Sequence, residues 1–249
     1  MASKPTGVRA RARAQFIDDI KRAAKAQLRS VGADSLSLRA VARELGVASS
    51  ALYRYFPSRD ELLTALITDA YNDVADAAEA AVASTAGRPF VERWLVLAQA
   101  IRGWALDRAH EFALIYGSPV PGYAAPPETA APVQRLTLTL LRLLHEGPLD
   151  HRVGPAAFRA PPATSGAYDL VRSLAEEAFE AHGDDPVGLT DGVLRAGIGL
   201  WTQLFGHLGF ELFGQFQNVV VDFDEFFEVQ MVEAAERLAP GSATVGGPG

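Results

Sequence analysis

Apolar positions recur at intervals of three and four residues over most of the chain, which is the period of an amphipathic helix. The first such series comprises Phe16, Ile20, Ala24, Leu28 and Val31. Gly32 follows it and is a suitable residue to end a helix. Later series predict helices over residues 62–83, 90–107, 110–116, 132–145, 165–182, 189–216 and 222–238. No stretch alternates convincingly with the period of two that a half-buried strand shows, so the sequence predicts an all-α fold.

Two short helices are expected between the first of these series and the helix that begins near residue 62. Ser37 is a suitable N-cap for the first short helix, and Gly46 can end it. The second short helix is expected over about residues 49–56. Ser58 and Glu61 then form an S-x-x-E capping box, which predicts the start of the next helix. Two short helices joined by a turn of about three residues have the spacing of a helix-turn-helix unit.

Charge is distributed unevenly between this unit and the rest of the chain. The formal net charge is -7, yet the first 60 residues contain 12 basic residues against 5 acidic ones. The remaining residues contain 11 basic residues against 25 acidic ones. A basic segment on an acidic protein favours contact between that segment and a polyanion. Composition alone also allows a solvated basic helix that has no partner.

The stretch LGVASSALYRYFPSRDELL carries side chains that suit DNA recognition. Small or hydrogen-bonding residues at the start of the second short helix allow the backbone to enter the major groove: Ser49, Ser50 and Ala51. Hydroxyl and guanidinium groups further along can reach phosphates or base edges: Tyr53, Arg54, Tyr55 and Arg59. Tyr55 and Phe56 are also candidates for core aromatics, and for Phe56 the core is the preferred interpretation. Arg9, Arg11 and Arg13 could form an arm in the minor groove or simply a frayed end.

The run SLRAVARELGVASSALYRYFPSRDELL resembles the signature of TetR/AcrR-family transcriptional regulators. The resemblance implies a three-helix DNA-binding domain, a larger helical domain for ligand binding and dimerisation, and repression that a small molecule relieves. It also implies that these residues face DNA: Ser37, Arg39, Ser50, Ala51, Tyr53, Arg54, Tyr55 and Arg59. Ala48 stands where the family frequently has serine, so we expect Ser49 to act as the helix cap. The segments FALIYGSPVPGY and GLWTQLFGHLGFELFGQF resemble the WHG-type C-terminal domain of one branch of the family.

The resemblance and the helical pattern together divide the chain into three parts. Residues 1–60 are expected to form the helix-turn-helix domain with a basic N-terminal arm, and residues 61–239 the effector-binding and dimerisation domain. The Gly-rich residues 240–249 are expected to form a disordered tail, and the Pro-rich residues 147–166 an irregular loop.

The larger domain offers candidates for two further sites, and core packing is the alternative for every one of them. The last two long helices, by resemblance, would form the dimer interface through Trp201, Phe205, Leu208, Leu212, Phe227 and Met231. Aromatic residues of the central helices are candidates for the wall of a largely apolar effector pocket: Trp94, Trp104, Phe112, Tyr116 and Tyr123.

Several other classes of protein lack support in the sequence. The chain has no cysteine, and its five histidines do not have the spacing of metal ligands. It contains none of the common hydrolase, nucleotide-binding or metalloprotease motifs. We therefore expect no catalytic residue, cofactor or metal site, no membrane partner, and a cytoplasmic protein. The remaining alternatives are an activator on the same scaffold, a helical adaptor, and a small-molecule-binding protein or enzyme without a DNA function.

Overall fold

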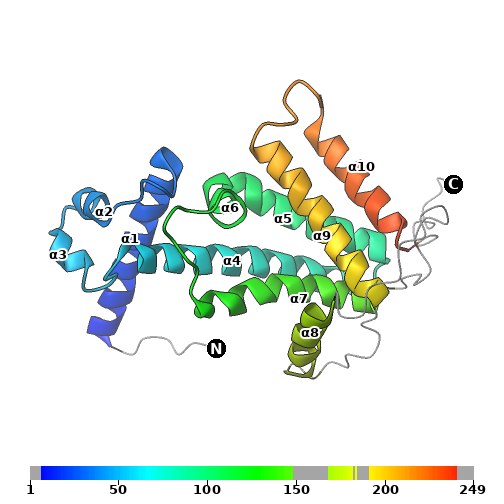
Figure 1. Ribbon diagram of the computed structural model, residues 1–249, viewed down its shortest axis with the longest axis horizontal. Coiled ribbons are helices and arrows are strands. Elements are labelled where there is room, and N and C mark those ends of the chain that lie inside the picture. The colour runs from blue at the N-terminus through cyan, green and yellow to red at the C-terminus, as the bar shows by residue number, and fades with distance from the viewer. Residues whose placement is uncertain (1–6, 148–167, 182, 184–190, 240–249) are drawn as a thin grey trace. The chain divides into compact units, whose positions relative to one another are not determined.

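The computed structural model describes residues 7–147, 168–181, 183 and 191–239, and Figure 1 shows its helices. The described residues form ten α-helices and one short 3₁₀ turn at Pro127–Thr129, with no strand among them. The prediction of an all-α fold is therefore confirmed. The chain divides into two compact units, of which the first contains Met1–Asp73 with Arg108–Pro132 and the second contains Val74–Asp107 with Val133–Gly249.

The first unit contains the predicted helix-turn-helix. Its helices are α1 (Val8–Val31), α2 (Leu38–Glu44), α3 (Ser49–Leu52), the first half of α4 (Arg59–Ser84) and α6 (Ala109–Tyr116). The apolar face of α1 is buried at Ile20, Ala24 and Leu28, and it shares one core with Val41 of α2 and Leu52 of α3. Neither short helix is long enough to be stable by itself, so both depend on packing against α1 in this core.

Local signals set most of the helix ends in this unit. Gly32 has a φ of 75° and ends α1, since a left-handed backbone suits glycine. Ser37 has an extended backbone and precedes α2 as its N-cap. At the start of α4, the backbone N–H of Glu61 donates to the Ser58 side-chain oxygen over 3.1 Å, as the capping box predicts.

The second short helix, α3, is the recognition helix of the helix-turn-helix; it begins at the expected residue but differs from its prediction in its cap and in its last residue. Its N-cap is Ala48, which has the extended backbone of a cap, whereas Ser49 is already helical, so the expected cap at Ser49 is wrong. The helix ends at Leu52 rather than Phe56. The next residues still turn, because the N–H groups of Tyr55 and Phe56 both donate to the Leu52 carbonyl. Propensity rules favour serine as the cap, but the backbone of the preceding turn decides which residue occupies that position.

The N-terminal residues of α1 extend well beyond the core. The helix begins at Val8, and its first buried residue is Ile20. Arg9, Arg11 and Arg13 therefore project from regular helix rather than from the extended arm that the sequence suggested.

The core beneath the helix-turn-helix also contains residues from a distant part of the chain. Leu114 of α6 and Val120 of the segment after it are both buried in this core, and Tyr123 packs against it. The unit that contains the helix-turn-helix thus extends beyond residue 60, where the sequence placed a domain boundary.

The second unit contains the remaining long helices. These are α5 (Phe90–Asp107), α7 (Ala130–Glu146), α8 (Asp169–Ala181), α9 (Asp191–Leu212) and α10 (Phe223–Glu236), together with the second half of α4. Trp94 of α5 is completely buried, and its indole N–H donates to the Met231 carbonyl of α10 over 3.0 Å. Asp222 caps α10 by accepting bonds from the N–H groups of Asp224 and Glu225.

Two predictions concern segments that the structure does not describe. The expected irregular loop at residues 147–166 and the expected disordered tail at residues 240–249 lie outside the described residues, apart from Gly147. Within the described part of the chain, none of the helices combines the length and the apolar character needed to cross a membrane.

Candidate DNA-binding surface

The outer face of α2 and α3 carries exposed polar and basic side chains above a buried core. Arg39 of α2, Ser50 of α3, and Tyr53 and Arg54 just after α3 are all exposed. Ser37, Ser49 and Ala51 are half-buried. Directly between these positions, Leu38 and Leu52 are buried, so the backbone of this surface is held in place from below. The structure thus presents a rigid, polar surface that could enter the major groove.

The cations of the first unit fall into two groups. Lys21 and Lys25 are neutralised internally, since Lys21 lies 2.9 Å from Asp69 and Lys25 lies 2.6 Å from the buried Glu111. By contrast, Arg39, Arg43 and Arg54 form no ion pair with any described residue. Because an unpaired guanidinium retains its full capacity for a phosphate or a base edge, these three arginines of the helix-turn-helix remain available to a polyanion.

Tyr55 and Phe56 have different environments from the exposed residues before them. Phe56 is buried, which confirms its interpretation as a core aromatic. The ring of Tyr55 is half-buried and packs edge to face against Phe16 at a centroid distance of 5.1 Å. The guanidinium of Arg13 lies over the same ring at 5.0 Å from its centroid. Tyr55 thus attaches the N-terminal half of α1 to the end of the recognition helix.

Arg59 is engaged within the protein. Its guanidinium donates to the carbonyl oxygens of Ala33 and Asp34 over 2.9 and 3.1 Å, and it lies 3.8 Å from the Asp60 carboxylate. These carbonyls belong to the connection between α1 and α2. Arg59 therefore ties the start of α4 to that connection, a role that its position near the LYRYF motif did not reveal.

Replacing Arg59 with alanine is expected to destabilise the protein by about 1 kcal/mol, because two backbone carbonyls lose a partly exposed charged donor. Urea denaturation measures this loss. Arg54→Ala is the matched variant, and it should leave stability unchanged while weakening DNA binding. An Arg59→Ala protein with unaltered stability and weakened DNA binding would show instead that the guanidinium contacts DNA.

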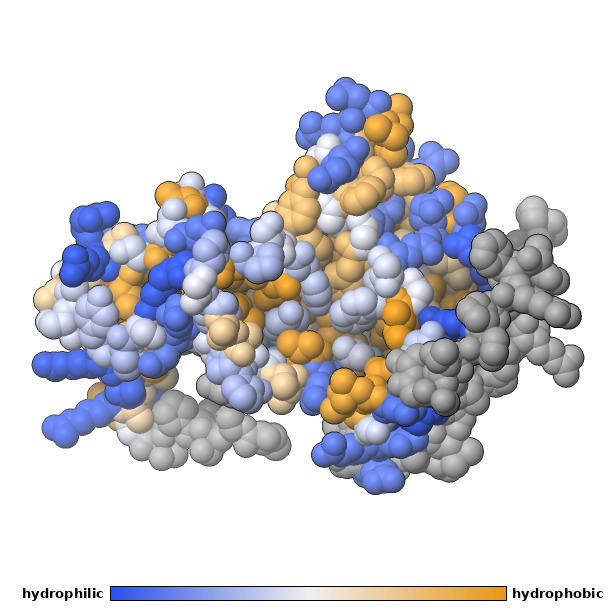
Figure 2. All heavy atoms as spheres, in the orientation of Figure 1, coloured by the Kyte–Doolittle hydropathy of each residue, from blue (hydrophilic) through white to orange (hydrophobic). Residues whose placement is uncertain are grey.

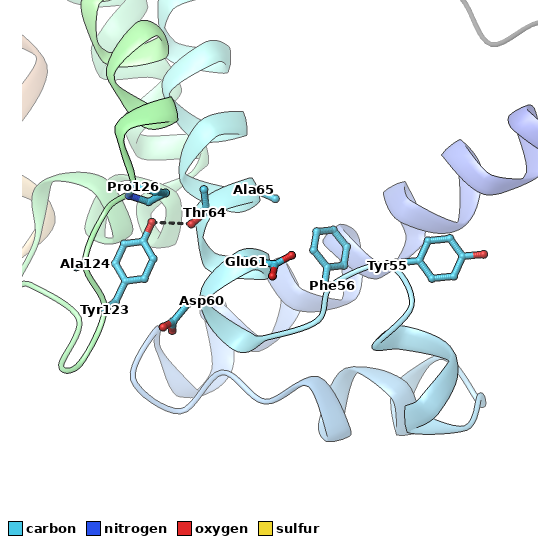
Figure 3. A pocket seen from close by; sticks show the side chains of 9 residues that line it. All are labelled: Tyr55, Phe56, Asp60, Glu61, Thr64, Ala65, Tyr123, Ala124 and Pro126. Atoms are coloured by element: carbon cyan, nitrogen blue, oxygen red, sulfur yellow. Dashed lines mark hydrogen bonds between the residues drawn. The ribbon is translucent and has the colours of Figure 1, made fainter.

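A groove of about 460 Å³ adjoins the helix-turn-helix at the first turns of α4. Figure 3 shows its lining, which includes Phe56, Asp60, Thr64 and Tyr123, with the ring of Tyr55 directed away from it. The hydroxyls of Thr64 and Tyr123 lie 2.9 Å apart and share a hydrogen bond. This bond and the burial of Val120 connect the segment after α6 to the core of the helix-turn-helix.

The five effector-pocket candidates are distributed over both compact units. Trp94 and Trp104 belong to the second unit, whereas Phe112, Tyr116 and Tyr123 belong to the first. Burial raises the pKa of the Tyr116 hydroxyl above its ordinary range. The indole nitrogen of Trp104 is buried and has no acceptor among the described residues. Tyr123 is the candidate that lines the groove in Figure 3.

The six dimer-interface candidates divide by burial. Leu208, Phe227 and Met231 are buried inside the second unit and have almost no surface to offer to a partner. Trp201, Phe205 and Leu212 are half-buried. Sequence reasoning did not identify several exposed apolar residues on or near the same helices: Ile198, Phe210, Phe213 and Val229. The four-residue spacing of positions 198, 202, 206 and 210 places them on one face of α9, so the sequence could have indicated that Ile198 and Phe210 lie on the same face.

Behind that face, the second unit contains a buried charged cluster. Arg102 of α5 makes a bidentate ion pair with Glu211 of α9, with bonds of 2.7 and 2.9 Å. A further bond of 2.7 Å reaches Asp224, and the guanidinium lies over the Phe227 ring. The hydrogen bonds that Arg102 donates to the Glu211 carboxylate raise the pKa of Arg102. Nearby, burial lowers the pKa of His207, whose ring packs against Phe227.

A helix-turn-helix whose outer arginines form no ion pair with a described residue is suited to binding DNA, and comparisons with known proteins identify the family. The model of the bacterial regulatory proteins of the tetR family matches residues 20–66. The model of the tetracyclin repressor-like C-terminal domain matches residues 94–234. The chain therefore belongs to the TetR family and is a DNA-binding transcriptional regulator, not an enzyme.

Individual relatives are similar over most of their length. The HTH-type transcriptional regulator Rv1816 of Mycobacterium tuberculosis is 38% identical over 226 residues, which cover 90% of this chain and 92% of that protein. The regulator Mb1846 of Mycobacterium bovis has the same identity and coverage. The solved structure of SCO4313 is 33% identical and superposes with a TM-score of 0.68 over 90% of this chain and 97% of that chain. A protein of unknown function from Rhodococcus sp. RHA1, 22% identical, shares the fold with a TM-score of 0.63 over 90% and 95% of the two chains.

Proposed function

We propose that the protein is a homodimeric repressor that binds an inverted-repeat operator in double-stranded DNA and leaves it when a small-molecule effector binds. The observation that carries this proposal is that Arg39 and Arg54 are exposed and form no ion pair with a described residue, whereas Lys21 and Lys25 of α1 are neutralised. In this proposal α3 enters the major groove with Ser50, Tyr53 and Arg54 directed at the DNA. Arg59 and the ring of Tyr55 support this surface from the protein side.

The smaller residues have roles that follow from their size and burial. The half-buried Ser49 and Ala51 let the α3 backbone approach the base pairs closely, and the exposed Ser50 can donate to a phosphate or a base edge. Ser37 and Arg39 at the start of α2 would contact the phosphates beside the groove, as backbone contacts fix orientation while base contacts specify sequence. Residues 1–60 thus carry the DNA contacts.

Dimerisation through α9 is supported by an apolar face that no other described part of the chain fully covers. Ile198, Gly199, Gly206 and Phe210 are exposed, and Trp201 and Phe205 beside them are half-buried. Apolar residues along α9 are visible at the surface in Figure 2. A Cβ atom at Gly199 or Gly206 would meet nothing within 4 Å, so open space lies above both glycines. A second copy could approach closely here, and an isologous pair places two recognition helices about one DNA turn apart.

Release by an effector is supported by the connection between the segment after α6 and the helix-turn-helix. Val120 lies in the core of that unit, and Tyr123 is bonded to Thr64 of α4. A ligand that displaced Tyr123 would therefore disturb the packing beneath the recognition helix. Such a ligand shifts the protein away from DNA only if it binds the disturbed arrangement better than the DNA-binding one. Since its target is chromosomal DNA, we propose that this regulator acts in the cytoplasm.

Selection of genomic DNA fragments by the purified protein tests the proposal. Wild type is expected to enrich an inverted repeat, and Tyr53→Ala/Arg54→Ala should bind each half-site at least about 30-fold more weakly, since two lost contacts of about 1–3 kcal/mol each sum to at least about 2 kcal/mol. Arg88→Ala is the control, because Arg88 is also an exposed arginine but belongs to the second unit.

A bound effector could silence a regulator that is otherwise intact. The selection is therefore run on the protein as purified and again after unfolding, dialysis and refolding. Absence of enrichment in both samples at low salt would overturn the proposal. The position of the operator relative to the promoter distinguishes a repressor from an activator. An operator that overlaps the promoter indicates repression, whereas an operator upstream of the promoter indicates activation on the same scaffold.

A further inference from the structure

The first turns of α1 carry a cationic surface that the core does not require. Arg9, Arg11 and Arg13 are exposed on regular helix, and the first buried residue of α1 comes only at Ile20. The helix has no acidic residue in its first turn, and its N-cap is Gly7, which has no side chain that could cap it. Positive side chains at a helix N-terminus oppose the helix macrodipole and weaken the helix. Stability alone therefore gives no reason for three arginines at this position.

Helical geometry divides these arginines into two groups. Arg9 and Arg13 are four residues apart and lie one above the other on the same face of α1. Arg11 is two residues from each of them and projects in a different direction. None of the three forms an ion pair with a described residue. Arg9 and Arg13 thus form a pair on one face of α1, and Arg11, within the same two turns, lies on a different face.

Contacts within the unit place the Arg9–Arg13 face beside the recognition helix. The Arg13 guanidinium lies 5.0 Å from the centroid of the Tyr55 ring, which in turn packs against Phe16. Tyr55 follows the last residue of α3 by three positions. The stack of Arg13, Tyr55 and Phe16 therefore holds the first turns of α1 against the end of the helix-turn-helix.

We propose that the face of α1 formed by Arg9 and Arg13 is a phosphate-binding surface that contacts the DNA backbone beside the base pairs read by α3. The inference rests on the proposed DNA-binding function and extends its footprint beyond the helix-turn-helix. A helix on the outside of the duplex contacts phosphates without reading bases, whereas an extended arm in the minor groove distinguishes A·T from G·C pairs. Arg11, on another face, contributes no direct contact.

The salt dependence of binding to the selected operator tests the proposal. The slope of log affinity against log salt concentration changes by about 0.9 for each phosphate contact in B-DNA. Arg9→Ala/Arg13→Ala is therefore expected to reduce the slope by about 1.8 for each half-site, with the ratio of operator to non-operator affinity unchanged. Arg11→Ala/Arg22→Ala removes the same charge from α1 and should leave the slope nearly as in wild type.

A second variant separates phosphate contact from displacement of the recognition helix. Arg9 has no described contact with Tyr55, so Arg9→Ala alone should still reduce the slope by about 0.9 for each half-site. Equal slopes for the two double variants would overturn the proposal, and so would a loss that depends on A·T pairs flanking the operator. If wild type itself selects no operator, the proposed DNA-binding function fails and this inference falls with it.

Discussion

Arg102→Met is expected to destabilise the protein by about 3–5 kcal/mol, because it leaves a carboxylate buried without its partner. Arg102 and Glu211 are only 12% and 6% exposed, and their ion pair joins α5 to α9 through two short parallel bonds. The substitution also removes the cation from the Phe227 ring. Equilibrium denaturation in urea measures the loss as a lower midpoint.

Two further variants identify the cause of that loss. Arg135 also binds two carboxylates, Asp76 and Glu79, but its side chain is 36% exposed and theirs are 68% and 45% exposed. Arg135→Met should therefore cost at most about 1 kcal/mol, as exposed ion pairs contribute little. Arg102→Met/Glu211→Leu removes both buried charges and should recover most of the stability. A double variant as unstable as Arg102→Met would show that shape rather than charge dominates at this site.

Helices and their ends were predictable because the signals for them are local. The 3.6-residue period of apolar positions located α5 at Phe90–Asp107, where the structure has it. The Ser58 and Glu61 capping box marked the start of α4, which begins at Arg59, three residues before the expected residue 62. The cap of α3 was the exception: serine is the preferred cap, but the backbone of the preceding turn places Ala48 at that position.

Contacts between distant residues could not be predicted from such signals. Arg102 and Glu211 are 109 positions apart, and no local pattern marks either of them as a partner for the other. A stripe of apolar residues shows that one face of a helix is covered but not what covers it. This is why Leu208, Phe227 and Met231 looked suited to a dimer interface, although the structure buries them within their own unit. Arg59 differs from Arg54 for the same reason, because only the fold places carbonyl oxygens beside it.

Gly206→Leu is expected to convert a dimeric protein into monomers, because a large side chain would occupy the space through which the second α9 approaches. Within the monomer the substitution should be tolerated, since Gly206 is exposed and no described atom lies within 4 Å of a Cβ atom at this position. Leucine should even strengthen the isolated helix, as it favours helix over glycine by nearly 1 kcal/mol. Sedimentation velocity measures the change in mass, and operator affinity should fall with it, because each half-site is then bound independently.

Gly103→Leu provides the matched control for this effect. Gly103 lies within α5, is exposed, and also has nothing within 4 Å of a Cβ atom, but it is not on the α9 face. Its replacement should change neither the mass nor the operator affinity. Equal behaviour of the two variants, with both remaining dimeric, would place the interface on a different surface. Dissociation of the Gly206→Leu protein alone would show that the glycines of α9 are retained for close approach of a second copy, which explains why this helix tolerates residues that weaken it.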